Sequence, residues 1–169
     1  MLVRALIVLA ATVGVLAAAF FGLTRQYTIH SVGMEPAIKP NDRVAVFRFS
    51  DWFYTPHRKD VVVFETPTPF SVSCGSRAVL RVIGLPGETV SERSGVVSIG
   101  GKPLKEPYVK PAQRDDRTDS WRVPKGHYFL MPDRRRFRCD SRKFGAIPTK
   151  RIVGKVFFTF WPFDRVSIG

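Results

Sequence analysis

The sequence predicts a mainly β protein, with one apolar N-terminal helix followed by an antiparallel β domain. Past residue 25, apolar residues come in short runs that are rich in β-branched and aromatic side chains. No amphipathic helical period is sustained there, and thirteen prolines add chain breaks that suit short strands. A chain of 169 residues with 44% hydrophobic residues can bury one core of ordinary size. We therefore expect one β domain without internal repeats.

The N-terminal segment predicts a transmembrane anchor. Residues 5–23 are apolar except for Thr12 and the glycines, and Arg4 and Arg25 flank them. At 1.5 Å per residue such a helix spans about 28 Å, close to the thickness of the hydrocarbon core. A cleavable signal peptide is the alternative, because residues 17–19 are three alanines that could form a cleavage site. The apolar run continues beyond that site, which favours an anchor over residues 1–25 and a β domain over residues 26–169.

Six strands are expected from their composition and from the Pro, Gly and Asp residues that bound them. They cover residues 44–47, 61–64, 79–83, 96–99, 128–131 and 155–160. Ser94-Gly95 and Gly100-Gly101 are hairpin turn signals. The polar, Pro-containing stretch 105–120 is expected to be a long surface loop.

Four segments carry a resemblance to a known family. Residues 31–36 read Ser-Val-Gly-Met-Glu-Pro, residues 60–64 read Asp-Val-Val-Val-Phe, and residues 80–88 read Leu-Arg-Val-Ile-Gly-Leu-Pro-Gly-Glu. Residues 129–142 read Phe-Leu-Met-Pro-Asp-Arg-Arg-Arg-Phe-Arg-Cys-Asp-Ser-Arg. In order and spacing these resemble the type I signal peptidases, membrane-anchored serine proteases that trim secretory leader peptides. Their motifs are Ser-Gly-Ser-Met-x-Pro, Lys-Arg-x-x-Gly-Leu-Pro-Gly-Asp and Gly-Asp-Asn-Arg-x-x-Ser-x-Asp-Ser-Arg.

The resemblance implies that the catalytic side chains are replaced. The family nucleophile, the serine before methionine, corresponds to Gly33, and the lysine base corresponds to Leu80. The serine that orients the lysine corresponds to Arg138. A serine hydroxyl needs a nearby base, and a lysine is a base only when a dry pocket lowers its pKa. Glycine and leucine supply neither group, so we expect a chain that does not catalyse proteolysis.

Other motif positions are kept. The resemblance implies that Ser31 is a relic of the oxyanion hole, that Asp140, Ser141 and Arg142 are structural relics, and that Met34 and Pro36 belong to a substrate groove. Ser31 does not replace the nucleophile, because two residues of strand displace it by about 6.6 Å. A base must lie within about 3 Å of the hydroxyl.

The two cysteines are expected to form a disulfide. Cys74 and Cys139 lie beside motifs that converge on one site in the family fold, and an outward-facing domain meets an oxidising environment. Two buried free thiols are the alternative. The spacing of two Cys and three His does not indicate a metal site, and no cofactor is expected.

A formal charge of +13 indicates an anionic partner, but the chain has no nucleic-acid recognition pattern. We expect membrane lipid instead, since anionic headgroups attract basic residues near the surface. Five aromatic residues interleaved with basic ones fit an interfacial belt or, equally, a core: Phe47, Phe49, Trp52, Phe53 and Tyr54.

Three functions are consistent with these observations. The first is an inactive signal peptidase relative that binds extended segments of secretory or surface proteins. An active serine endopeptidase that cleaves leader peptides is the second, and a basic membrane-surface adaptor the third. By resemblance, the protein is expected in the cell membrane as a single-pass protein whose C-terminal domain lies outside the cytoplasm.

Overall fold

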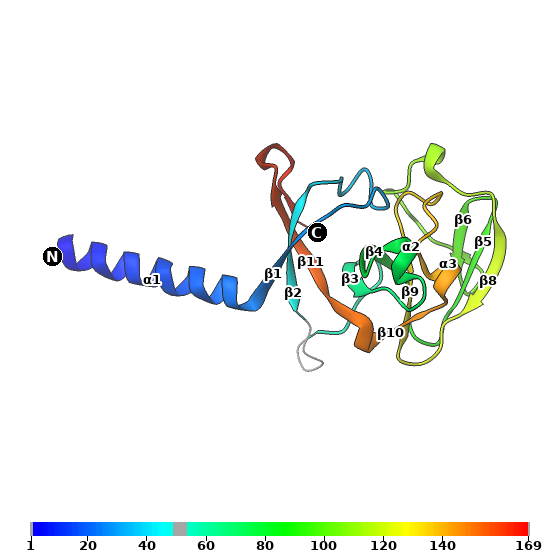
Figure 1. The fold of residues 1–169 in the computed structure, drawn as a ribbon, viewed down its shortest axis with the longest axis horizontal. Helices are drawn as coiled ribbons and strands as arrows, with labels where there is room; N and C mark the ends of the chain where they lie inside the picture. The colour runs from blue at the N-terminus through cyan, green and yellow to red at the C-terminus, as the bar shows by residue number, and fades with distance from the viewer. Residues whose placement is uncertain (1, 49–53, 169) are drawn as a thin grey trace.

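The computed structural model describes residues 2–48 and 54–168, and it consists of an extended N-terminal helix attached to a β domain (Figure 1). The helices are α1 (Leu2–Leu23), α2 (Ser71–Cys74) and α3 (Ser141–Phe144). Short 3-10 helices follow at Pro111–Gln113, Thr149–Arg151 and Phe163–Arg165. The strands are β1 (Thr24–Thr28), β2 (Arg43–Arg48), β3 (Val61–Glu65), β4 (Arg77–Gly84), β5 (Thr89–Arg93), β6 (Val96–Ile99), β7 (Lys102–Pro103), β8 (Thr118–Arg122), β9 (His127–Met131), β10 (Ile147–Pro148), β11 (Ile152–Trp161) and β12 (Ser167–Ile168).

The strands form two antiparallel sheets. The larger sheet has the order β1-β2-β11-β3-β4-β9-β10, with β12 paired to β11. The smaller sheet has the order β7-β6-β5-β8 and lies at the end of the domain opposite α1 (Figure 1). Strand β4 leads from one sheet to the other, since its end at Gly84 is followed by β5 at Thr89. The expectation of a mainly β, antiparallel domain is confirmed.

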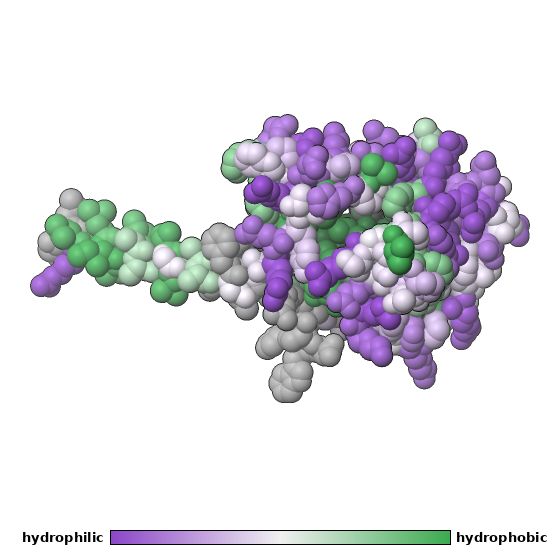
Figure 2. Space-filling view, in the orientation of Figure 1, coloured by the Kyte–Doolittle hydropathy of each residue, from purple (hydrophilic) through white to green (hydrophobic). Residues whose placement is uncertain are grey.

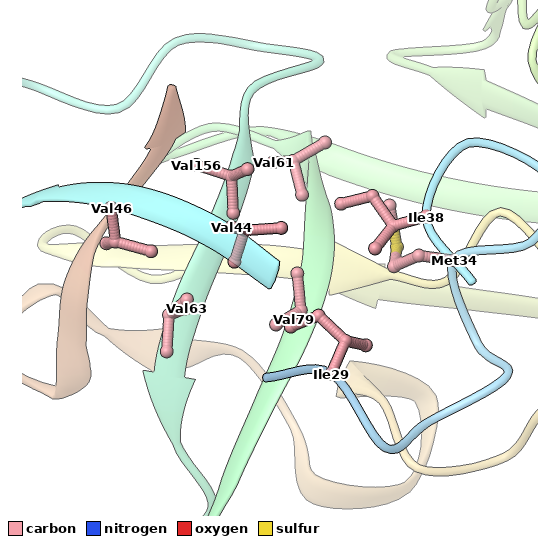
Figure 3. Close-up of a cluster of buried hydrophobic side chains, with 9 residues drawn as sticks. All are labelled: Ile29, Met34, Ile38, Val44, Val46, Val61, Val63, Val79 and Val156. Atoms are coloured by element: carbon pink, nitrogen blue, oxygen red, sulfur yellow. The ribbon is translucent and has the colours of Figure 1, made fainter. Parts of the chain in front are cut away.

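The apolar run Val61–Phe64 of β3 is explained by burial of both faces of the strand. Val61 and Val63 belong to one buried cluster, which contains nine residues and is drawn in Figure 3. Val62 and Phe64 belong to a second cluster on the opposite face of the sheet. A strand that is covered on both faces reads as a continuous apolar run, because alternate side chains point to opposite faces. A third cluster, around Val90 and Phe129, joins the larger sheet to the smaller one.

The six strands predicted from composition are present, and five of them are longer than predicted by one to four residues. Both hairpin signals are also confirmed, since Ser94, Gly95, Gly100 and Gly101 have positive φ angles at the β5–β6 and β6–β7 turns. The surface loop predicted over residues 105–120 is partly wrong, because β8 begins at Thr118. Most residues of β8 are polar and give no strand signal in the sequence. The strand pairs with β5, for example Asp119 opposite Glu92.

Helix α1 extends away from the β domain (Figure 1) and carries exposed apolar side chains, seen as a green rod in Figure 2. In the part of the chain that the structure describes, no helix combines the length and apolarity needed to cross a membrane, so the predicted transmembrane span is not found. The helix ends at Leu23, and Thr24 and Arg25 belong to β1.

The structure describes only part of the aromatic segment that the sequence predicts as a membrane-interface belt or a core. Phe49, Trp52 and Phe53 lie outside the described residues. Phe47 is 39% exposed on β2, and Tyr54 is half-buried beside Asp60.

Candidate functional site

Hydrogen bonds tie the three motif segments together. Arg81, the residue after Leu80, donates from Nε and Nη2 to the two carboxylate oxygens of Asp133 at 2.8 and 2.6 Å. The next residue, Arg134, donates its backbone N–H to the carbonyl of Gly33 at 2.9 Å. Segments that are far apart in sequence, 31–36, 80–88 and 129–142, therefore meet at one place.

A neighbouring aromatic ring lies close to position 33. A Cβ atom added to Gly33 would lie 2.8 Å from Cδ1 of Phe137 and 3.2 Å from Oγ of Ser31. The Gly33 N–H donates to that same Ser31 oxygen at 3.0 Å. Within the described residues this is the hydrogen bond that the Ser31 side chain makes, and no basic side chain is bonded to it. Phe137, which the sequence did not single out, thus crowds the space that a side chain at position 33 would enter.

Leu80 lies in an apolar environment. Its side chain is 1% exposed and belongs to the second buried cluster with Phe64, Val82 and Leu130. Tyr128 is the one member of this cluster with a polar side chain, and burial raises the pKa of its phenol, which stays protonated at neutral pH. A dry pocket of this kind suits leucine, and it is also the setting in which a lysine amine would be held neutral.

Arg138 points away from this cluster. Its side chain is 50% exposed, and Nη2 donates to Oδ1 of Asp115 at 3.1 Å. Arg138, which the resemblance matches to the lysine-orienting serine, therefore forms a surface ion pair.

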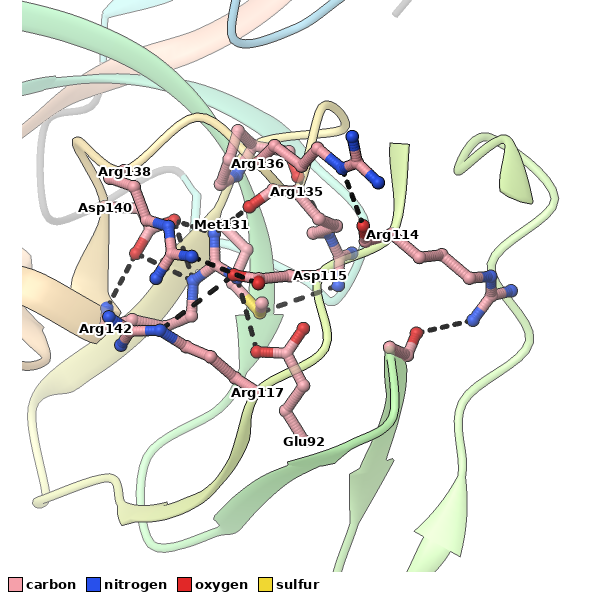
Figure 4. Close-up of polar contacts among 12 residues, drawn as sticks. Glu92, Arg114, Asp115, Arg117, Met131, Arg135, Arg136, Arg138, Asp140 and Arg142 are labelled. Atoms are coloured by element: carbon pink, nitrogen blue, oxygen red, sulfur yellow. Dashed lines mark hydrogen bonds and ion pairs between the residues drawn. The ribbon is translucent and has the colours of Figure 1, made fainter. Parts of the chain in front are cut away.

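Arg142 anchors the loop that carries Phe137 (Figure 4). Its side chain is 1% exposed and donates to the carboxylates of Asp140, Glu92 and Asp115. The Nη2 group also donates to the carbonyls of Arg135 and Phe137, at 2.5 and 3.2 Å. Burial raises the pKa of Glu92 although Arg142 opposes the shift. One buried guanidinium therefore forms ion pairs with three carboxylates.

Asp140 and Ser141 have local structural roles that the resemblance did not specify. Asp140 is buried and caps α3 by accepting from the N–H of Arg142 at 2.8 Å. The Ser141 hydroxyl accepts from the N–H of Leu130 at 2.9 Å, which joins α3 to β9. The two residues hold the third motif against the larger sheet.

A groove with a volume of about 510 Å³ runs beside Ser31. Figure 2 shows a hollow with apolar walls on the face that carries α2. One side is formed by residues 27–31 and the other by residues 73–79, with Val63, Phe137 and Cys139 also lining it. Met34, predicted for the groove, is instead buried in the first cluster, where its apolar side chain packs with Ile38 and Val79, and Pro36 is exposed; neither lines this cavity.

Two strand edges face this groove. In the described residues β1 pairs only with β2, and β4 pairs over Arg77–Leu80 only with β3, since its pairing with β9 starts at Arg81. A strand side that does not pair within a sheet can bond another strand through its backbone N–H and C=O groups.

Cys74 and Cys139 are joined as a disulfide, the pairing expected from the sequence, with Cα atoms 5.6 Å apart. Both residues line the groove, so the bridge links α2 to the Phe137 loop as part of the groove wall. Among the described residues no group of three His, Cys, Asp or Glu side chains could hold a metal ion.

Glu88 closes the second motif and provides a pH-dependent contact. Its carboxylate accepts from the Arg58 guanidinium and, at 2.7 Å, from the N–H of Leu85. Burial raises the pKa of Glu88, but hydrogen bonds from Arg58 and Leu85 lower the pKa by more than burial raises it. The pKa therefore lies below its ordinary value of 4.5.

We expect Glu88→Gln to lower the free energy of unfolding by about 1–2 kcal/mol at neutral pH. A lowered pKa means that the carboxylate stabilises the fold above the unfolded pKa of 4.5 and loses this effect as the pH falls through the folded value. Urea denaturation at neutral pH and at successive steps below pH 4.5 measures the difference in the free energy of unfolding between the wild type and the variant. This difference should become smaller as the pH falls. Glu65→Gln, at an exposed pair, is the control. A difference that stays constant with pH would contradict the prediction.

The fold and the site define a two-sheet β protein with an apolar groove beside a serine peptidase motif. A profile described as "Signal peptidase, peptidase S26" matches residues 2–161, and the chain belongs to this family. Signal peptidase I of Leptolyngbya laminosa is 36% identical over 142 residues, covering 82% of this chain and 70% of the relative. Signal peptidase I V of Bacillus subtilis is 34% identical over 143 residues, covering 77% of this chain and 82% of the relative.

A solved structure gives the same result for the fold. The crystal structure of a signal peptidase I from Enterococcus faecalis superposes with a TM-score of 0.52 and is 30% identical. The match covers 61% of this chain and 97% of the other. The family resemblance deduced from the four segments is confirmed.

Proposed function

We propose that this chain is a signal peptidase I-like protein that binds extended segments of secretory or surface proteins without cleaving them. The observation that supports inactivity is the pair of replacements at the site. Gly33 has no side chain, and a Cβ added there would lie only 2.8 Å from the Phe137 ring. Leu80 has no proton-accepting group and is buried among apolar residues. Losing such a nucleophile and base together removes a factor on the order of 10⁶ from the rate.

The groove supports peptide binding. An extended peptide can add as a strand to a free sheet edge, with main-chain hydrogen bonds supplying affinity and side-chain pockets supplying specificity. Here the free sides of β1 and β4 face one cavity, and its floor includes Ile29, Val63 and Val79. The family name supports leader peptides of secretory proteins as the segments that bind.

We further propose that residues 1–25 attach the domain of residues 26–169 to a lipid membrane, with that domain outside the cytoplasm. Apolar side chains of α1 are exposed to solvent over most of the helix, for example Leu6 at 58%, Val8 at 65% and Leu16 at 65%. Apolar surface of this extent marks an interaction site, and a lipid bilayer would cover it. The chain's positive charge supports anionic lipid as a component of that surface.

A cleavage assay tests inactivity. Purified full-length protein in detergent is incubated with a leader peptide, and products are measured by mass spectrometry beside a mock preparation. We expect no cleavage above the mock level from the wild type. The quadruple variant Gly33→Ser, Leu80→Lys, Arg138→Ser, Phe137→Ala restores the missing groups and removes the obstructing ring, and it is the variant in which cleavage is expected. Wild-type turnover that is absent from the mock would disprove inactivity, and Ser31→Ala would then show whether Ser31 is the nucleophile.

Peptide binding is tested separately by calorimetry with the same leader peptide. Measurable affinity supports the binding function. The absence of affinity at millimolar peptide would instead favour the basic membrane-surface adaptor, which the formal charge of +13 supports independently. The relatives are named as signal peptidases, and their names favour an active endopeptidase. The cleavage assay distinguishes this alternative from an inactive protein.

A further inference from the structure

The groove beside Ser31 continues into a second cavity of different character. This cavity, about 670 Å³ in volume, lies between the end of α1, strand β1 and the start of β4, and it is lined by Gly22, Thr24, Arg25, Gln26 and Val153. Tyr27 and Arg77 line both cavities, so the two meet at this pair. The first cavity is largely apolar, and the second is bordered by polar backbone and basic side chains.

Arg77 lies where the two cavities meet, and its guanidinium can donate further hydrogen bonds. Its guanidinium carbon lies 5.9 Å from the centre of the Tyr27 ring, and its side chain is 54% exposed. Its ion pair with Glu65 is long, 4.0 Å, and Glu65 is itself 53% exposed. Such an exposed pair contributes little, and a guanidinium has five N–H groups to offer. No carboxylate of the described residues lines either cavity, whereas Arg25 and Arg77 both do.

The strand geometry fixes the spacing between this charge and the apolar floor. Arg77 and Val79 lie two residues apart on β4, opposite Glu65 and Val63 of β3, and they therefore share one face of the sheet. Val79 belongs to the first buried cluster and lines the groove. A peptide strand added along this edge would place its residues i and i+2 beside Val79 and Arg77 on that same face.

We propose that Arg77 selects peptides in which a carboxylate side chain lies two residues from an apolar side chain. The apolar residue enters the cavity at Val79 and Phe137, and the carboxylate accepts hydrogen bonds from Arg77 in place of Glu65. This inference rests on the proposed peptide-binding function and adds a charge preference to it. Arg25 extends the basic character toward the end of α1, where the peptide continues.

The experiment uses the full chain in detergent and fluorescently labelled peptides measured by anisotropy. Peptides carry Val and, two positions away, Asp, Asn or Lys, in both orders. We expect the wild type to bind the Asp peptide about three- to fivefold more tightly than the Asn peptide in at least one order, the size of effect for one half-exposed ion pair. Arg77→Glu should reverse the preference so that the Lys peptide binds best, and Arg77→Gln should abolish it.

Lys102→Glu, an exposed basic residue on β7 of the smaller sheet, changes the net charge equally and should leave the preference unchanged. Equal preference in the wild type and Arg77→Glu, or the same reversal in Lys102→Glu, would overturn the role of Arg77. If all peptides bind without regard to charge, this inference fails and peptide binding stands. If none binds, the proposed function fails as well.

Discussion

Replacing Arg142 by Met is expected to destabilise the β domain by about 3–5 kcal/mol, the cost of removing one partner from a buried ion pair. The guanidinium is 1% exposed and donates to Asp140, Glu92 and Asp115, whose side chains are at most 8% exposed. Without the guanidinium, three buried carboxylates have lost their shared ion-pair partner. Met can fill the volume of the arginine side chain but supplies no positive charge. The carboxylates must then take up protons or admit water, and either costs free energy.

Urea denaturation, followed by tryptophan fluorescence at neutral pH, measures this loss. Arg122→Met, at an exposed position of β8, is the matched control and should change the stability by less than about 0.5 kcal/mol. Arg142→Lys should recover only part of the loss, because an ammonium group cannot reproduce the planar fork that reaches Asp140 and the carbonyls of Arg135 and Phe137 at once. A destabilisation below 1 kcal/mol for Arg142→Met would contradict the anchoring role.

Removing the disulfide is expected to cost about 4 kcal/mol. Cys74 and Cys139 are 65 residues apart in sequence, and a cross-link over a loop of this length restricts the unfolded chain strongly in the chain-entropy description. The double variant Cys74→Ser, Cys139→Ser leaves the folded packing nearly unchanged in volume. Its denaturation midpoint should therefore fall below that of the oxidised wild type and match that of the reduced wild type.

Thiol titration supplies the direct check on this prediction. Denatured, unreduced protein should react with no equivalents of a thiol reagent, and reduced protein with two, since the chain has two cysteines. Two reactive thiols before reduction would rule out the bridge. Because both cysteines line the groove, the variant should also bind leader peptide more weakly if peptide binding is the function.

Much of the fold could be predicted from the sequence because local composition determines it. The run Val61-Val62-Val63-Phe64 indicated a buried strand, and it lies between two apolar clusters. Ser94-Gly95 and Gly100-Gly101 indicated turns, since these residues tolerate the positive φ angles found there. Strand β8 could not be predicted in the same way, because Asp119 and Ser120 are typical of turns and the strand is evident only from its pairing with β5.

The sequence by itself determined the family and the presence of glycine and leucine at positions 33 and 80, because residue identity at a motif position is a local property. Only the tertiary structure decided which side chain packs beside Gly33. Phe137 lies more than a hundred residues from Gly33 in the chain, and it reaches that position because Arg134 binds the Gly33 carbonyl and Arg142 holds the loop. Contacts between distant segments depend on how the sheets pack, so the Phe137 ring beside Gly33, the two-part groove and the place of Arg77 emerged only from the fold.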